Sequence, residues 1–281
     1  MKRLKKALPR CILALLVATV LLFLSGYLRA SWLCGEIRKG NEINTSFSNG
    51  LTAPRFLDEV ASIMQCDGPK IPLVEACYYR NIQAVEVLLE NGADPNFFLE
   101  GRLSPLEAAV WYGPVDETSY KIVKLLVSAG ADVDLHASRE SVVYQVASKI
   151  SISSDSYWLE QVLFCLLDQG ADRSQREPFD EVFHCVVCST KVELARSLID
   201  KYGCDPTAPG YMGRNALSTL LAYARESSRH EVPTVEMVQM LLDYGVDPYQ
   251  KDDNGKTAVD YAIELNNAEI LSLLDGMEQG M

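Results

Sequence analysis

The chain has 281 residues, 48% of them hydrophobic, so it can bury a substantial core, and this composition excludes a disordered tail. The first 30 residues contain six basic residues and no acidic one, so the remainder holds 20 basic and 38 acidic residues, a formal charge of −18. Such a charge repels the phosphate backbone and disfavours nucleic-acid binding, whereas it suits a basic partner or simply solubility.

The amino terminus has the features of a membrane anchor. Basic residues within 1–10 precede an uncharged run over residues 11–28, which would extend about 27 Å as a helix, close to the thickness of one hydrocarbon core. Tyr27 and Trp32 follow where interfacial aromatic residues are typical. We expect 1–10 to be a basic cytoplasmic segment and 11–28 a transmembrane signal-anchor helix. The rest of the chain should then lie outside the cytoplasm, in a periplasmic or extracellular space.

A cleaved signal peptide has the same basic and apolar parts, so secretion after cleavage is the alternative. Cleavage requires small residues before the cut site. Leu28 precedes a cut after Ala30, and Leu24 precedes one after Gly26. The sequence therefore favours an uncleaved anchor.

A short motif recurs along the rest of the chain. An apolar run ending in Leu-Leu or Leu-Ile is followed three or four residues later by Gly, and two residues after that by Asp. These glycines are separated by 38, 40, 33 and 42 residues, a base period near 33 with insertions: Gly92, Gly130, Gly170, Gly203 and Gly245. Gly can adopt the left-handed conformation that ends a helix, and Asp accepts hydrogen bonds in the turn. The period indicates stacked helical units.

A second signal marks the start of the next helix. Ser104 is expected to cap a helix with Pro105 in its first turn, and the small Ala108 and Ala109 allow close helix packing. The same offset from Gly203 and Gly245 reaches Asn215-Ala216 and Thr257-Ala258. With the Leu-Leu-x-x-Gly-Ala-Asp segments, these starts resemble the Gly-x-Thr-Pro-Leu-His-x-Ala signature of the ankyrin repeat family.

The resemblance implies an all-α ankyrin-repeat solenoid of about six helix-turn-helix repeats with short hairpin fingers, preceded by the one transmembrane helix. The repeats would cover residues 67–278 and start near 67, 101, 138, 178, 213 and 252. Residues 29–66 would form a linker, in which a helix over 54–64 could cap the first repeat. Insertions at 113–119, 150–156 and 225–233 should lie between the two helices of a repeat, where longer loops cost little.

No residue set predicts a catalytic, cofactor or metal site. Gly255-Lys256-Thr257 resembles the end of a phosphate-binding loop, but Gln250 stands where that loop requires Gly. The three histidines fall in three different repeats without the spacing of zinc ligands, and His184 is expected to be structural. No small-molecule substrate is evident.

Cys185-Val186-Val187-Cys188 is the one motif that could support covalent chemistry. A redox pair needs its first Cys exposed at a helix amino terminus, where the helix dipole lowers the thiol pKa. This pair falls inside the first helix of the fourth repeat, so packing of small apolar thiols is the preferred interpretation.

The resemblance implies a binding module for a protein partner, either an adaptor or an inhibitor. One alternative is a thiol-active or other envelope enzyme that uses Cys185 and Cys188. Another is a protective or assembly partner of a co-expressed enzyme or toxin. Aromatic residues in and near the fingers are the expected partner contacts: Phe97, Phe98, Trp111, Tyr112, Tyr211 and Tyr249. Phe97 or Phe98 could instead fold back near Trp111 and Tyr112 and complete the core.

Overall fold

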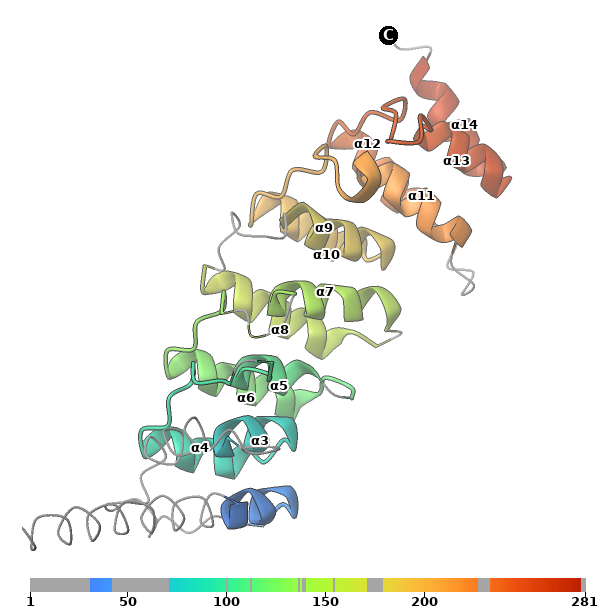
Figure 1. Ribbon diagram of the computed structural model, residues 1–281. Helices are drawn as coiled ribbons and strands as arrows, with labels where there is room; N and C mark the ends of the chain where they lie inside the picture. The colour runs from blue at the N-terminus through green and yellow to red at the C-terminus, as the bar shows by residue number, and fades with distance from the viewer. Residues whose placement is uncertain are drawn as a thin grey trace, which may run out of the picture. The chain divides into compact units, whose positions relative to one another are not determined.

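The computed structural model describes residues 31–41, 71–170, 179–226 and 233–278, apart from Glu100, Tyr112, His136, Ser138, Arg139 and Ser154. Across these described ranges all regular secondary structure is helical (Figure 1). The chain divides into two compact units, Met1–Arg139 and Glu140–Met281, and each unit is described by itself.

Within its described residues, the first unit contains a helix at residues 31–38 and two helix pairs. The pairs are α3 (Pro72–Tyr78) with α4 (Ile82–Glu90), and α5 (Pro105–Trp111) with α6 (Glu117–Ser128). The first helices α3 and α5 pack on one another, and the second helices α4 and α6 do the same. Ala76, Val85, Ile122, Val123 and Leu126 are completely buried, so the apolar faces of the helices form the core between the pairs.

The second unit contains four helix pairs within its described residues. They are α7 (Val142–Ile152) with α8 (Tyr157–Asp168), α9 (Phe179–Cys188) with α10 (Val192–Asp200), α11 (Ala216–Glu226) with α12 (Val235–Asp243), and α13 (Ala258–Leu265) with α14 (Ala268–Glu278). The first helices pack in the order α7, α9, α11, α13, and a short 3-10 helix, η2 (Tyr211–Gly213), precedes α11.

Caps fix where the first helices begin. Ser104 and Glu107 cap each other, because the Ser104 hydroxyl accepts from the Glu107 amide (3.2 Å) and the Glu107 carboxylate accepts from the Ser104 amide (2.7 Å). Asn215 accepts from the Ser218 amide at 2.9 Å, and Thr257 forms a capping box with Asp260. The caps expected at Ser104, Asn215 and Thr257 are therefore confirmed.

The glycine turns also agree with the sequence. Each of the five motif glycines has a φ between 68° and 89°, the left-handed region that favours Gly. Asp94, Asp132, Asp205 and Asp247 each accept a hydrogen bond from the backbone amide two residues later, at 2.8–2.9 Å. The three expected insertions overlap the connections before α6, α8 and α12, but residues 117–119, 150–152 and 225–226 belong to the helices themselves.

The first repeat is covered by the helix at residues 31–38. Leu33, Cys34 and Ile37 are buried, and Arg38 forms an ion pair with Glu75 of α3 at 2.9 Å. The expected cap over 54–64 and the expected anchor over 11–28 lie outside the described residues. Among the residues that the structure describes, no helix is both long enough and apolar enough to cross a bilayer.

Candidate functional site

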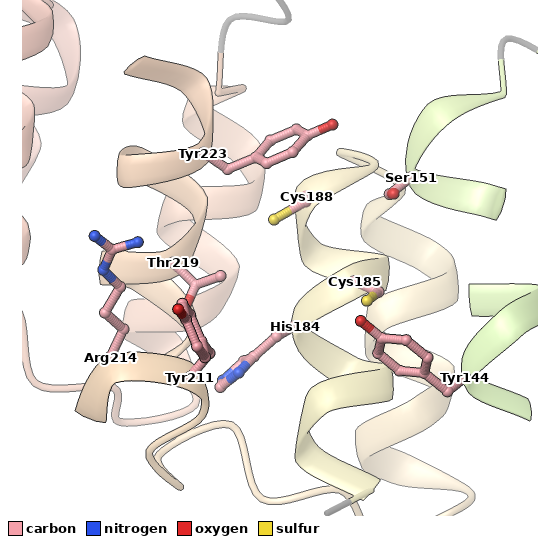
Figure 2. Close-up of a pocket in the computed structure, with 9 residues that line it drawn as sticks. All are labelled: Tyr144, Ser151, His184, Cys185, Cys188, Tyr211, Arg214, Thr219 and Tyr223. Atoms are coloured by element: carbon pink, nitrogen blue, oxygen red, sulfur yellow. The ribbon is translucent and has the colours of Figure 1, made fainter. Parts of the chain in front are cut away.

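A cavity of about 240 Å³ opens on the first-helix face of the second unit, between α7, α9 and α11 (Figure 2). Its lining combines three tyrosines with thiols, hydroxyls, an imidazole and one guanidinium group: Tyr144, Ser151, His184, Cys185, Cys188, Tyr211, Arg214, Thr219 and Tyr223. We call this the tyrosine-lined cavity.

Helical periodicity brings these side chains together. Residues three and four apart share one face of a helix, so His184 and Cys185 lie beside Cys188 on α9, and Thr219 lies beside Tyr223 on α11. Ser141 caps α7 by accepting from the Tyr144 amide (3.1 Å), which places Tyr144 three positions after the cap. Figure 2 shows the Tyr144 ring near Cys185 and Tyr223 extending from α11 towards α9.

His184 is the most deeply buried polar side chain of the lining, with 5% exposure. Burial lowers its pKa to about 4, because the charged imidazolium would lose its hydration, so the ring is neutral at pH 7. Its Nε2 atom is buried without a hydrogen-bond partner. The ring lies directly against Gly210, where a Cβ atom would stand 1.9 Å from Nδ1. Gly210 therefore leaves the space that the ring occupies.

Among the described residues of the lining, Arg214 is the only one formally charged at neutral pH, and two carboxylates already compensate its charge. Its guanidinium lies 3.5 Å from both Asp252 and Glu226, and 5.2 Å from the centroid of the Tyr261 ring. Asp252 is itself fixed by the Tyr261 hydroxyl, which donates to it at 2.6 Å. This network holds Arg214 at the cavity edge and leaves little charge for a ligand to neutralise.

The two thiols lack the setting of a redox pair. Cys188 is buried and is the last residue of α9, while Cys185 is half-buried within the helix. A helix amino terminus would lower a thiol pKa, but neither residue lies at one. Within the described part of the chain, no group of three or more metal-ligating side chains is arranged to hold an ion.

The predicted contact residues differ in how far the structure exposes them. Tyr211, in η2 at the rim of the cavity, is 75% exposed, and Trp111, the last residue of α5, is 47% exposed. Phe97, Phe98 and Tyr249 are half-buried. Tyr112 lies outside the described residues.

Sequence reasoning missed Tyr144, Tyr223 and Thr219, and it assigned His184 only a structural role. Tyr144 and His184 each stand where the repeat signature has His. The unusual tyrosine at that position could have marked Tyr144 as a candidate site residue. The grouping itself depends on how three first helices pack, which the repeat motif alone does not specify.

A second candidate, slightly larger in volume, lies in the first unit. A cavity of about 270 Å³ is lined by Ile71, Val74, Glu75, Tyr78, Tyr79, Arg102 and Leu103. Arg38 covers part of this region, because it pairs with Glu75 and stacks 5.5 Å from the centroid of the Tyr79 ring. We regard the tyrosine-lined cavity as the better candidate, because it contains a buried polar atom without a partner.

Comparisons with solved structures reveal similar folds. The human ASB11 ankyrin repeat domain is 19% identical with a TM-score of 0.57, and the match covers 86% of this chain and 96% of that domain. An ankyrin repeat domain from Acinetobacter baumannii AYE is 21% identical with a TM-score of 0.58, covering 72% of this chain and 95% of the other.

A third similar chain comes from the complex of the Bd0816 predatory endopeptidase of Bdellovibrio bacteriovorus with immunity protein Bd3460. It is 23% identical with a TM-score of 0.56, and the match covers 74% of this chain and 98% of that chain. No curated protein matches this chain in sequence.

Two family models match the sequence itself. Residues 43–137 match a model of three ankyrin repeats, and residues 221–274 match a model of many ankyrin repeats. The first match begins before residue 67, where the repeats were expected to start. Together with the helix pairs and their glycine turns, these matches identify the chain as an ankyrin-repeat protein.

Proposed function

We propose that this chain is a membrane-tethered binding module that uses the first-helix face of its repeats to hold a protein partner. The observation that carries the proposal is the tyrosine-lined cavity, which combines exposed aromatic area with a buried hydrogen-bonding group left without a partner. Tyrosine is enriched at interaction hot spots because it offers both a large apolar surface and a polar tip.

The ankyrin-repeat fold supports binding over catalysis, since neither matching family model describes an enzyme. The buried position of Cys188 argues in the same direction. The similar chain from the endopeptidase and immunity protein complex favours an inhibitor-like role over a general adaptor. In this role the chain would hold an enzyme or toxin through surface complementarity.

The proposed tether is the apolar run over residues 11–28, preceded by basic residues that favour a cytoplasmic amino terminus. The helical residues 31–38 are separated from that run by only two residues and contact α3 through Arg38 and Glu75. A tether at 11–28 would therefore hold the first repeat close to the membrane surface.

Two measurements test this function. The full-length chain, carrying a carboxyl-terminal tag and crosslinked in membranes of the source organism, should capture one protein reproducibly. Protease added from outside the cytoplasm should digest the repeats. A mature amino terminus near residue 30 would show that the chain is cleaved and secreted, and not tethered. Digestion of the repeats only from the cytoplasmic side would show the opposite topology. Failure to enrich any protein over a tagged unrelated membrane protein would contradict the binding role.

A further inference from the structure

We propose that the tyrosine-lined cavity receives one uncharged, hydroxyl-bearing aromatic side chain of the protein partner, a tyrosine, whose hydroxyl group hydrogen-bonds to His184. This inference rests on the proposed function, because it assigns the chemistry of the partner residue at the same surface. It is argued from the charge, the polar atoms and the walls of the cavity.

The charge balance of the lining disfavours a charged occupant. None of the described lining residues carries a carboxylate, so a lysine or arginine side chain would meet no counter-ion among them. The guanidinium of Arg214 already faces Asp252 and Glu226, so a carboxylate would compete with two internal partners. Burying a charge without a partner is costly, and the cavity therefore selects against both signs.

The Nε2 atom of His184 requires a hydrogen-bonding group. It is buried without a partner, although buried polar atoms of native proteins nearly always have one. Since the ring is neutral at pH 7, Nε2 either donates or accepts, depending on the tautomer. A hydroxyl group can do both, so it satisfies either tautomer. Figure 2 shows the His184 ring extending from α9 towards Tyr211, on the side of the cavity.

The walls of the tyrosine-lined cavity favour an occupant with an aromatic ring over an aliphatic side chain that carries a hydroxyl group. Tyr144, Tyr211 and Tyr223 contribute rings from α7, η2 and α11. Aromatic pairs gain beyond their buried area through edge-to-face or offset contacts. A tyrosine combines such a ring with the hydroxyl group that His184 requires.

The first test uses soluble amino-acid amides as probes on the purified full-length chain. N-acetyl-tyrosinamide should slow alkylation of Cys185, which lines the cavity, while Cys165 on α8 serves as the internal reference. N-acetyl-phenylalaninamide lacks the hydroxyl and should bind about fivefold more weakly, the usual effect of losing one hydrogen bond. N-acetyl-lysinamide and the corresponding glutamate amide should give no protection. Stronger protection by either charged probe, or protection by none, overturns the inference.

A matched pair of phenylalanine variants connects the probe to the partner. T219F should fill the cavity from α11 and abolish protection by N-acetyl-tyrosinamide, while I263F adds the same ring at an exposed position of α13 outside the lining and should preserve it. Thermal melting and circular dichroism show whether T219F folds. If it does not, Y223W is the second cavity-filling variant.

Capture of the partner then separates the two proposals. Capture lost by the folded filling variant and retained by I263F supports the cavity as the receiving site. Equal capture by both variants overturns this inference and leaves the proposed function standing. Absence of any specific partner contradicts the proposed function. The probe experiment does not need the partner, so it still tests which side chain the cavity binds.

Discussion

The hydroxyl group of Tyr202 donates a hydrogen bond to Asp168 at 2.7 Å and so joins the ends of two consecutive second helices, α10 and α8. The arrangement recurs one repeat further on, where the Tyr244 hydroxyl donates to Asp200, also at 2.7 Å. In both cases the tyrosine directly precedes the helix-ending glycine, and the aspartate is the last residue of the preceding second helix. The bond therefore connects neighbouring repeats at a fixed register.

Removing only the hydroxyl of this contact should destabilise the second unit. Tyr202 is 4% exposed, and its ring stacks on Phe164 with the centroids 6.1 Å apart, so Y202F keeps the packing and leaves Asp168 with one donor fewer. We expect a loss of about 1 kcal/mol in the free energy of unfolding, measured by urea denaturation.

Lys201 offers a matched control on the same acceptor. It pairs with Asp168 at 2.7 Å, but its side chain is largely exposed, so solvent screens this ion pair and K201M should destabilise the unit less than Y202F does. A K201M loss as large as that of Y202F would show that the charge, and not the buried hydroxyl group, carries this contact.

The covering helix at residues 31–38 leads to a second prediction. Ile37 is completely buried, so I37A should leave a void beside the first repeat and cost about 2–5 kcal/mol. Hydrogen exchange should show the loss first in α3, on which Arg38 of this helix is anchored. Trp32, which is mostly exposed, supplies the control W32A. Unchanged protection of α3 in I37A would mean that this helix does not cover the repeat.

The fold was largely predictable because its signals are local. Gly203 and Gly245 end helices for steric reasons, and Ser104 and Thr257 begin them by satisfying free amides, so each can be read from a few neighbouring residues. The helix at residues 31–38 was not predicted. Its buried residues follow a pattern too short to distinguish from the end of the apolar run before it.

The site was less predictable because it depends on contacts between repeats. Phe98 and Tyr249 are unusual for fingers, yet the structure half-buries both, and a sequence pattern does not reveal which way a finger side chain turns. His184 fits the signature position, but only the packing of α9 against α11 makes its Nε2 atom a buried group without a partner.

Tyr211 is the sharpest test of the partner surface. It is 75% exposed, so Y211A should leave the melting temperature nearly unchanged. Capture of the partner should weaken by about 1–3 kcal/mol if Tyr211 is a hot spot. Tyr157 is also exposed but lies outside the tyrosine-lined cavity, so Y157A is the control and should capture normally. Equal capture by Y211A and the unmodified chain would exclude Tyr211 from the interface.

The thiols should be dispensable for binding. Replacing Cys185 and Cys188 together by Ser changes little volume, and neither thiol lies at a helix amino terminus. We expect normal partner capture with some loss of stability, because Cys188 is buried and a hydroxyl group is less apolar than a thiol. The double Ala variant controls for the added hydroxyl groups. If both variants fold normally but lose partner capture, the alternative of a thiol-active enzyme would again have to be considered.

His184 should make the stability of the second unit depend on pH. Burial lowers its native pKa from 6.5 to about 4, so above pH 6.5 the ring is neutral in both the folded and the unfolded chain, and its contribution to stability is constant. As the pH falls below 6.5, the unfolded chain binds a proton that the folded chain does not, so stability decreases until the pH reaches the native pKa.

Lowering the pH from 7 to 5 should therefore reduce the free energy of unfolding by about 2 kcal/mol through this imidazole. The H184Q variant has no imidazole at this position and should not show this reduction. The comparison uses the pH slopes of the two proteins and not their absolute stabilities, because H184Q changes the packing against Gly210 as well. Carboxylates titrate in both proteins and cancel in the difference. The ring resonances of His184 should also remain unshifted in NMR spectra recorded from pH 8 down to pH 5. If stability changes equally with pH in the two proteins, or if the ring titrates near pH 6.5, the imidazole is exposed to water and is not buried in the wall of the cavity.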